Sequence, residues 1–499
     1  MSKNTFLTVT TSALACSLCT LPTFAAVAPT GDVDPSPPMS GQGVTVGDAA
    51  VGSLTIDGGS SFSTGTTTND QSVIIGNQLT GDGSVLVDGA GSSLETLFLR
   101  VGVEGTAQFT ASNGATVSVV DDFSIRGDNT ATVTGTGTVF QAGDSIFING
   151  PTAATLNIAD NATFEIVPPT PDNRFFIGSS GNTKGVVNVT SGATLEFLDD
   201  GTAPFRTFVG TQFDTAQGEL NINTGATVTL GRTDVGNDSV GNGATGVINV
   251  DGVGTTLNFV QAVTGDSTGN GAGDLMLGSG GNGTLNITGG ASVNVADDIF
   301  VALGDDSTGE LNVLDGTLDI GDGLFIGYNN TGPLTVGTGA LITASRFVVT
   351  NTDTNPNITP GDATVTFELS KDINGDELNG LIDVIDFSFR SGSRELVLDL
   401  DDTVTFELGD VFVLVDYLTL GNNLSGAVTT QAFDNVGDDE IINFGGVDFL
   451  IDYNDILGPD DLAFTATVVP EPGSLVALLG FGAVCLARRS GRQRFLQSN

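Results

Sequence analysis

The sequence predicts an all-β protein built as a parallel, right-handed β-helix of about eleven rungs. A phrase of three apolar residues and a glycine, followed by a polar loop, Gly-x-Leu-Asn-Val and Gly-Ala-x-Leu, recurs at spacings of mostly about 23 to 32 residues. Each copy holds three short runs of alternating apolar residues separated by turn-forming residues, and helical periodicity is absent. Three such strands cannot bury an apolar face alone, so successive copies must stack around one continuous core.

The first element in chain order is a signal peptide over residues 1–25. Lys3 precedes an apolar stretch, and Thr23 and Ala25 supply the small residues that signal peptidase needs before a cleavage point between Ala25 and Ala26. Signal peptidase is therefore an expected partner, and we expect the chain to be exported. Residues 26–40 are expected to form a disordered leader.

The repeat domain spans residues 41–349. In one clear copy, the phrase ending at Gly278 leads to Leu285-Asn286-Ile287. Alternation predicts that Leu285 and Ile287 point inward and that Asn286 points outward, where stacked amides can hydrogen-bond along the axis. The predicted outward column contains Asn157, Asn188, Asn221, Asn249, Asn286 and Asn312, with Thr55, Thr132 and Thr335 in the same place in other copies.

The pattern changes after Val349. Residues 350–362, with Asn-Pro and Thr-Pro steps, are expected to form a linker. Longer alternating runs such as Ala363–Leu369 and Val411–Val415 then predict a separate all-β unit over residues 363–467. This unit is expected to be either a small sandwich or an irregular cap that closes the open end of the helix, since an exposed last rung would be an aggregation edge.

The last segment, residues 468–499, has three parts in a fixed order. Val469-Pro470-Glu471-Pro472 precedes an apolar run from Leu475 to Ala487, and Arg488-Arg489 follows. The run is about 13 to 15 residues long, whereas a permanent membrane-spanning helix needs about 20. Arginines on the cytoplasmic side would hold such a short helix in the membrane. These features predict transient membrane association through a short C-terminal transmembrane helix, with an ordinary tail anchor or a C-terminal core helix as alternatives.

This order of motif, apolar segment and basic stop resembles the PEP-CTERM sorting signal. The repeats, over residues 41–349, resemble the autotransporter or PEP-CTERM-associated repeats of exported β-helical proteins. The first resemblance implies processing by an exosortase-type enzyme and a place at the cell surface, outer envelope or extracellular matrix. Together they imply a structural or adhesive role, for example in a biofilm, with extracellular polysaccharide or matrix proteins as partners.

The amino-acid composition limits the catalytic groups that the mature chain could contain. The chain has no histidine, and its three cysteines, Cys16, Cys19 and Cys485, lie in segments that we expect to be removed. The usual general base, zinc ligands and thiolate nucleophile would then be missing from the mature chain, so we predict no catalytic residues and no enzyme. A net charge of −44 also argues against nucleic acid as a partner.

Paired carboxylates leave one enzymatic alternative, a β-helix polysaccharide lyase or glycoside hydrolase. Acids recur just before the apolar-glycine phrase, at Asp122, Asp144, Asp274, Asp298 and Asp322. Their return in copy after copy favours a feature of the repeat, since a catalytic pair would be a local exception.

A calcium-dependent binding module is the second alternative. Asp372, Asn374, Asp376 and Asp383 stand at positions 1, 3, 5 and 12 of a loop, a spacing that resembles the calcium loop of EF-hands and dockerins. Glu377 occupies the sixth position, where glycine makes the sharp turn, so an ordinary Asn-Gly hairpin turn is the competing interpretation. No other cofactor is expected.

Overall fold

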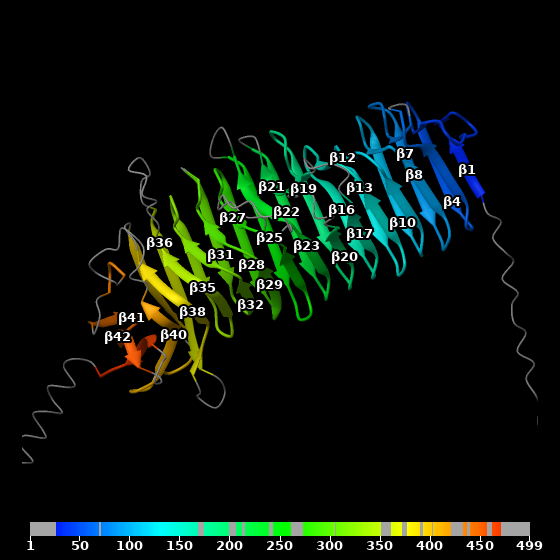
Figure 1. Cartoon of the computed structure of the whole chain (residues 1–499). Helices are drawn as coiled ribbons and strands as arrows, with labels where there is room; N and C mark the ends of the chain where they lie inside the picture. The colour runs from blue at the N-terminus through cyan, green and yellow to red at the C-terminus, as the bar shows by residue number, and fades with distance from the viewer. Residues whose placement is uncertain are drawn as a thin grey trace, which may run out of the picture.

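The computed structural model describes residues 26–68, 71–167, 174–198, 206–211, 215–238, 243–260, 273–304, 306–350, 361–371, 377–389, 393–401, 403–420, 433–436, 440–456 and 462–470. Within these ranges the chain is all-β, and its strands stack into a parallel β-helix. Figure 1 shows a long rod with β1 (Ala26–Gly31) at one end and β41 (Glu440–Phe444) and β42 (Val447–Ile456) at the other. The predicted fold class is confirmed.

Three faces run the length of the rod, each built from one strand per rung. The first face contains the Gly-x-Leu-Asn-Val strands: β4 (Val51–Asp57), β7 (Asp82–Asp88), β10 (Thr106–Ser112), β13 (Thr130–Thr134), β16 (Ala154–Ala159), β19 (Lys184–Val189), β22 (Gln217–Asn223), β25 (Thr245–Asp251), β28 (Asn282–Thr288), β31 (Thr308–Val313), β34 (Gly332–Val336), β36 (Ala363–Lys371) and β39 (Arg394–Leu400). Those from β4 to β34 give the eleven predicted rungs.

The second face contains the Gly-Ala-x-Leu strands: β5 (Ser61–Gly65), β8 (Ser93–Thr96), β11 (Thr116–Val119), β14 (Val139–Ala142), β17 (Thr163–Ile166), β20 (Thr194–Phe197), β23 (Thr227–Leu230), β26 (Thr256–Phe259), β29 (Ala291–Val295), β32 (Gly316–Ile320), β35 (Leu341–Val349), β38 (Leu381–Phe389) and β40 (Val411–Leu420). The third face contains the apolar-glycine strands: β3 (Val44–Val46), β6 (Ser72–Ile75), β9 (Phe98–Val101), β12 (Phe123–Arg126), β15 (Ile146–Asn149), β18 (Arg174–Ile177), β21 (Arg206–Thr211), β24 (Arg232–Asn237), β27 (Leu275–Leu277), β30 (Ile299–Val301) and β33 (Gly323–Ile326). β35 and β38 are long enough to continue from the second face into the third.

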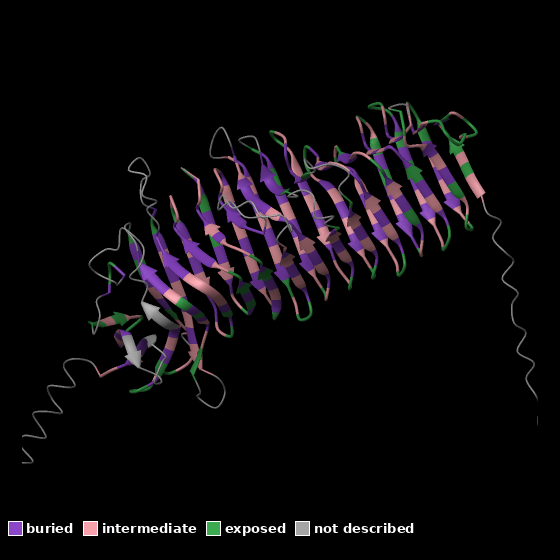
Figure 2. Cartoon of the chain, viewed as in Figure 1, coloured by how far each residue is buried: buried purple, intermediate pink, exposed green. Residues whose placement is uncertain are grey.

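The core fills the space between the three faces. Buried and half-buried residues alternate along the strands of the rod (Figure 2). Leu285 and Ile287 are fully buried, as the alternation predicted. Phenylalanines from neighbouring rungs stack inside, and the rings of Phe140 and Phe164 lie 4.8 Å apart and nearly parallel. Burial of such side chains stabilises the fold by about 1.5 to 3 kcal/mol each.

The predicted asparagine ladder forms along the outside of the first face. Asn249 donates from Nδ2 to Oδ1 of Asn221 at 2.8 Å and accepts from Nδ2 of Asn286 at 2.8 Å. The ladder continues through Asn188 to Asn157 at one end and to Asn312 at the other. Each amide is half-buried, so these bonds add direct rung-to-rung contacts to the backbone ladder.

The glycine that recurs at the end of most third-face strands has a steric cause. Gly278 has φ +73°, and a Cβ there would lie only 2.4 Å from the carbonyl oxygen of Thr308 in the next rung. Glycine alone fits without strain at so close an approach. In the copy that begins at Ile299, the same place is taken by Ala302, which holds φ +62°.

The N-terminal end corrects one expectation. Residues 26–40 were expected to be a disordered leader, but β1 pairs antiparallel with β4, and β2 (Val33–Asp34) pairs antiparallel with β3. Asp32 fixes this arrangement, because its Oδ2 accepts from the backbone N–H groups of Ala49 and Ala50. The first rung supplies an unpaired strand edge, and this edge orders a segment that has little β propensity of its own.

At the other end, parallel pairing continues past Val349. β36 pairs in register with β34 and then with β39, and β38 pairs with β35 and then with β40, so the segment from residue 363 begins as further rungs of the same helix. Residues 351–360 of the expected linker lie outside the described residues.

Antiparallel strands then close this end. β43 (Leu462–Val468) pairs with β40 and β42, and β41 pairs with β42, while β37 (Glu377–Asn379) pairs antiparallel with β36. The edge of β39 is covered by residues 433–436, where Asn435 exchanges two hydrogen bonds with the backbone of Leu396. Of the two arrangements expected for residues 363–467, these contacts favour the cap.

Candidate functional site

Acidic side chains gather at one corner of the rod, where each rung turns from the second face to the third. We call this the acidic corner. Two of these turns are three residues long and end in a pair of aspartates: residues 120–122 join β11 to β12, and residues 296–298 join β29 to β30. Backbone hydrogen bonds stack them, because Asp144 N–H donates to the carbonyl of Asp121 and Asp322 N–H donates to that of Asp297. Carboxylates at equivalent turns therefore lie next to one another along the axis.

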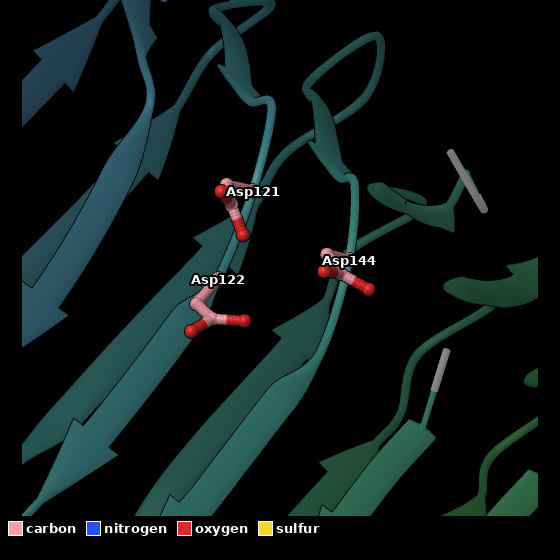
Figure 3. Close-up of side chains that lie close together, drawn as sticks. All are labelled: Asp121, Asp122 and Asp144. Atoms are coloured by element: carbon pink, nitrogen blue, oxygen red, sulfur yellow. The ribbon is translucent and has the colours of Figure 1, made fainter. Parts of the chain in front are cut away.

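The first group at the acidic corner is formed by Asp121, Asp122 and Asp144. One carboxylate oxygen from each lies within 4.8 Å of the other two, and all three residues are half-buried. Figure 3 shows Asp121 and Asp122 projecting from one turn and Asp144 from the equivalent turn of the next rung. Burial, followed by the charges of Asp121 and Asp144, raises the pKa of Asp122, although a backbone hydrogen bond and Arg100 oppose the shift.

The second group is formed by Asp274, Asp297 and Asp298, which also bring one oxygen each within 4.8 Å of the others. Asp274 is only 1% exposed, and its Oδ2 has no hydrogen-bond partner. Asp297 and Asp298 are half-buried, and Asp298 Oδ1 accepts from the backbone N–H of Gly323 at 2.8 Å. This group therefore contains a buried carboxylate oxygen without a hydrogen-bond partner, and no described oxygen of the first group is of this kind.

Burial and mutual repulsion shift the pKa values of this second group. Burial raises the pKa of Asp274 to about 7, and the charges of Asp297 and Asp298 add to the shift. Burial likewise raises the pKa of Asp298 to about 6, against the hydrogen bond from Gly323. The pKa of Asp297 is raised by burial and by the charge of Asp322. Burial removes these carboxylates from water, and the nearby positive charge is too small to offset the cost of keeping them ionised.

Arg346 on β35 neutralises the end of the corner. Its Nη2 lies 2.6 Å from Asp322 Oδ2 and its Nε donates to Asp322 Oδ1 at 3.0 Å, a two-point contact. Asp298 Oδ1 lies farther from the same guanidinium, at 3.7 Å. The guanidinium also lies over the ring of Phe325, which holds it in place. The guanidinium therefore neutralises mainly Asp322, which lies one rung beyond the second group.

The structure brings the five acids identified in the sequence to one corner, as expected of a repeat feature. It divides them into two groups along the rod, with Asp322 paired to Arg346. The sequence analysis missed Asp121 and Asp297, which directly precede two of the predicted acids, and it missed Arg346. Adjacent acids in the same turn were the available signal for the first two, whereas Arg346 is placed by the extension of β35 across the corner.

Such carboxylate groups can share protons or hold a hard cation. Proton transfer to a glycan would require the carboxylates to reach the substrate. The 1% exposure of Asp274 keeps its side chain from contact with a polymer in this conformation. This limits the access of a polymer to Asp274, whereas Asp121, Asp122 and Asp144 are half-buried.

Asp383, one of the four predicted calcium ligands, lies exposed on β38. There it lines a groove of about 550 Å³ with Asp319 and Asp416 on the second face. The other three, Asp372, Asn374 and Asp376, lie outside the described residues, so the calcium loop stays a prediction.

The terminal signals fall at the limits of the described chain. Ala26 begins β1, and Ala25 lies outside the described residues. Val469 follows β43 and donates its backbone N–H to Asp448 at 2.9 Å. Pro470 is the last described residue; Glu471, Pro472, Arg488, Arg489 and the expected transmembrane segment lie beyond it. The described part of the chain contains no helix long and apolar enough to cross a membrane.

Comparison with known families gives a match at this end of the chain. The model of the PEP-CTERM protein-sorting motif matches residues 468–493. No curated protein matches the chain. The match covers the motif, the apolar run and the arginine pair that the sequence analysis singled out. The chain therefore carries a PEP-CTERM protein-sorting motif, the signal of an exported protein that is processed by an exosortase-type enzyme.

Proposed function

We propose that the protein is a structural or adhesive component of the cell surface or extracellular matrix, exported through its signal peptide and processed at its C-terminal motif. The observation that carries this proposal is the position of the sorting motif, directly after the strand that closes a long solenoid. Delivery of the rod outside the cell would then be the purpose of the motif.

Three features of the rod support a structural role. Its rungs repeat with little variation, its ends are closed by antiparallel strands, and its net charge of −44 keeps an exported chain soluble. Extracellular polysaccharide or matrix proteins are the partners that we propose. Glycan cleavage would need accessible carboxylates, and the group with the most strongly shifted pKa values contains a buried one.

Mass spectrometry of the C-terminus in secreted, surface and cytoplasmic fractions tests the proposal. We expect mature protein outside the cell that ends near Val469 and lacks Arg488 and Arg489. Replacing Pro470 and Pro472 with alanine should leave an unprocessed chain, whereas Pro356→Ala, in the expected linker, should be processed normally. Protein found only in the cytoplasm, or mature protein that keeps its arginine tail, would overturn the proposal.

A further inference from the structure

We propose that Asp274, Asp297 and Asp298 bind one hard divalent cation of the Ca²⁺ type, which joins two successive rungs at the acidic corner. This site is separate from the loop at residues 372–383. It concerns the stability of the rod and does not depend on where the protein is delivered.

The geometry fits one ion. The three carboxylates come from two rungs: Asp274 precedes β27, while Asp297 and Asp298 precede β30, the next strand on the third face. One oxygen from each residue lies within 4.8 Å of the other two. Oxygens that bind one Ca²⁺ at about 2.4 Å can be at most about 4.8 Å apart, and the three carboxylates meet this limit.

A second, independent observation comes from Asp274 itself. Its side chain is 1% exposed, and Oδ2 has neither a hydrogen-bond partner nor access to solvent. Buried polar atoms in folded proteins nearly always have a partner, because an unpaired buried carboxylate is costly. A cation bound by this oxygen would supply the missing partner. The group at Asp121, by contrast, has no such buried oxygen and carries no proposal.

The charges around the site point the same way. Within the described residues, Asp274 and Asp297 form no ion pair, and Asp298 has only the 3.7 Å contact to Arg346. Arg346 is already bound at two points by Asp322. Arg232 also acts on Asp274 from a distance, but it is paired with Asp234 at 3.8 Å. Neither arginine is therefore dedicated to the three carboxylates, and a divalent ion would restore the balance.

The chemistry of the ligands selects the class of ion. All three groups offer oxygen ligands, and the chain has no histidine. Zinc and other metals that prefer nitrogen or sulfur ligands would therefore bind weakly at this site. Mg²⁺ requires near-ideal octahedral geometry, whereas Ca²⁺ accepts irregular sets of carboxylates completed by water. Ca²⁺ is therefore the ion to test first.

Isothermal titration of the exported protein with CaCl₂, after treatment with EDTA, tests the proposal. We expect Asp274→Asn to bind one ion fewer per chain than the wild type. Asp251→Asn, which removes an exposed acid at the end of the first-face strand β25, should bind as the wild type does. A calcium site elsewhere, including the loop at residues 372–383, would contribute equally to all three proteins.

Asp297→Asn provides a second variant that leaves the buried position intact, and it should weaken binding at this site by at least about tenfold. Hydrogen exchange in β27 and β30 gives an independent measurement: Ca²⁺ should slow it in the wild type and in Asp251→Asn, and should have no effect in Asp274→Asn. Equal stoichiometry in wild type and Asp274→Asn, or calcium-independent exchange in the wild type, would overturn the proposal.

Discussion

Replacing Asn249 with alanine tests whether the asparagine ladder stabilises the rod. The change removes two hydrogen bonds of 2.8 Å, one to Asn221 and one from Asn286. A hydrogen bond of this kind contributes about 0.5 to 1.5 kcal/mol net, so the expected loss is about 1 to 3 kcal/mol. The lower half of this range is favoured, because the amides are half-buried and water can satisfy the groups left behind.

Hydrogen exchange is the suitable assay, because each rung of a solenoid contacts only its neighbours and the loss should be local. Protection should fall in β22, β25 and β28 and stay unchanged in β7. Asn249→Thr should recover part of the loss, since threonine stands in the same column at Thr335 and favours strands.

Asn258 on the second face provides the control. It makes one side-chain hydrogen bond, from Asn294, at an exposed position. Asn258→Ala should therefore lower protection by less than half as much as Asn249→Ala. Equal effects of the two changes, or no effect of Asn249→Ala, would refute the idea that the ladder holds the rungs together.

Three further predictions concern the core, the acidic corner and the C-terminal signal. Leu285→Ala should destabilise the protein by about 2 to 5 kcal/mol in urea unfolding, because the side chain is fully buried, and a loss below 1 kcal/mol would contradict its place in the core. In EDTA, the free energy of unfolding should fall as pH rises from about 4 to 7, by at most about 4 kcal/mol from Asp274, because the folded state raises the pKa of this residue from 3.8 to about 7 and so keeps a proton that the unfolded state has lost. Unfolding curves at pH 5 and pH 8 should show this difference in the wild type and a smaller one in Asp274→Asn; no dependence on pH would contradict it. Reversing the charge of Arg488 and Arg489 to glutamate should prevent C-terminal processing, seen as a larger mature chain on an immunoblot, and normal processing would show that the positive charges are not needed.

The rungs could be predicted because their cause is local. Leu285 and Ile287 alternate with Asn286, and a period of two assigns each side chain to one side of a strand. Stacking then follows from the repeat, which also places the asparagines in one column. The same logic located the acids at a single corner.

What failed to follow from the sequence depends on contacts between distant segments. The strand β1 exists because the first rung offers it an edge, and its own residues, Ala-Val-Ala-Pro-Thr-Gly, give little sign of it. The grouping of Asp274 with Asp297 and Asp298 depends on how two successive turns stack, which the hydrogen bond from Leu275 N–H to the carbonyl of Asp298 fixes. The neutralisation of Asp322 depends on β35, which crosses the corner and carries Arg346 to it.

The antiparallel strands at the two ends set a fixed reach for the molecule. A bare parallel rung would accept a rung from another copy, and assemblies of such copies would grow to lengths governed by protein concentration. Here β1 occupies one terminal edge, while β43 and residues 433–436 occupy edges at the other. The number of repeats in the sequence therefore sets the distance between the two ends of the rod. A layer of such molecules would have the same height whether they are sparse or crowded, which is the behaviour of a molecular spacer.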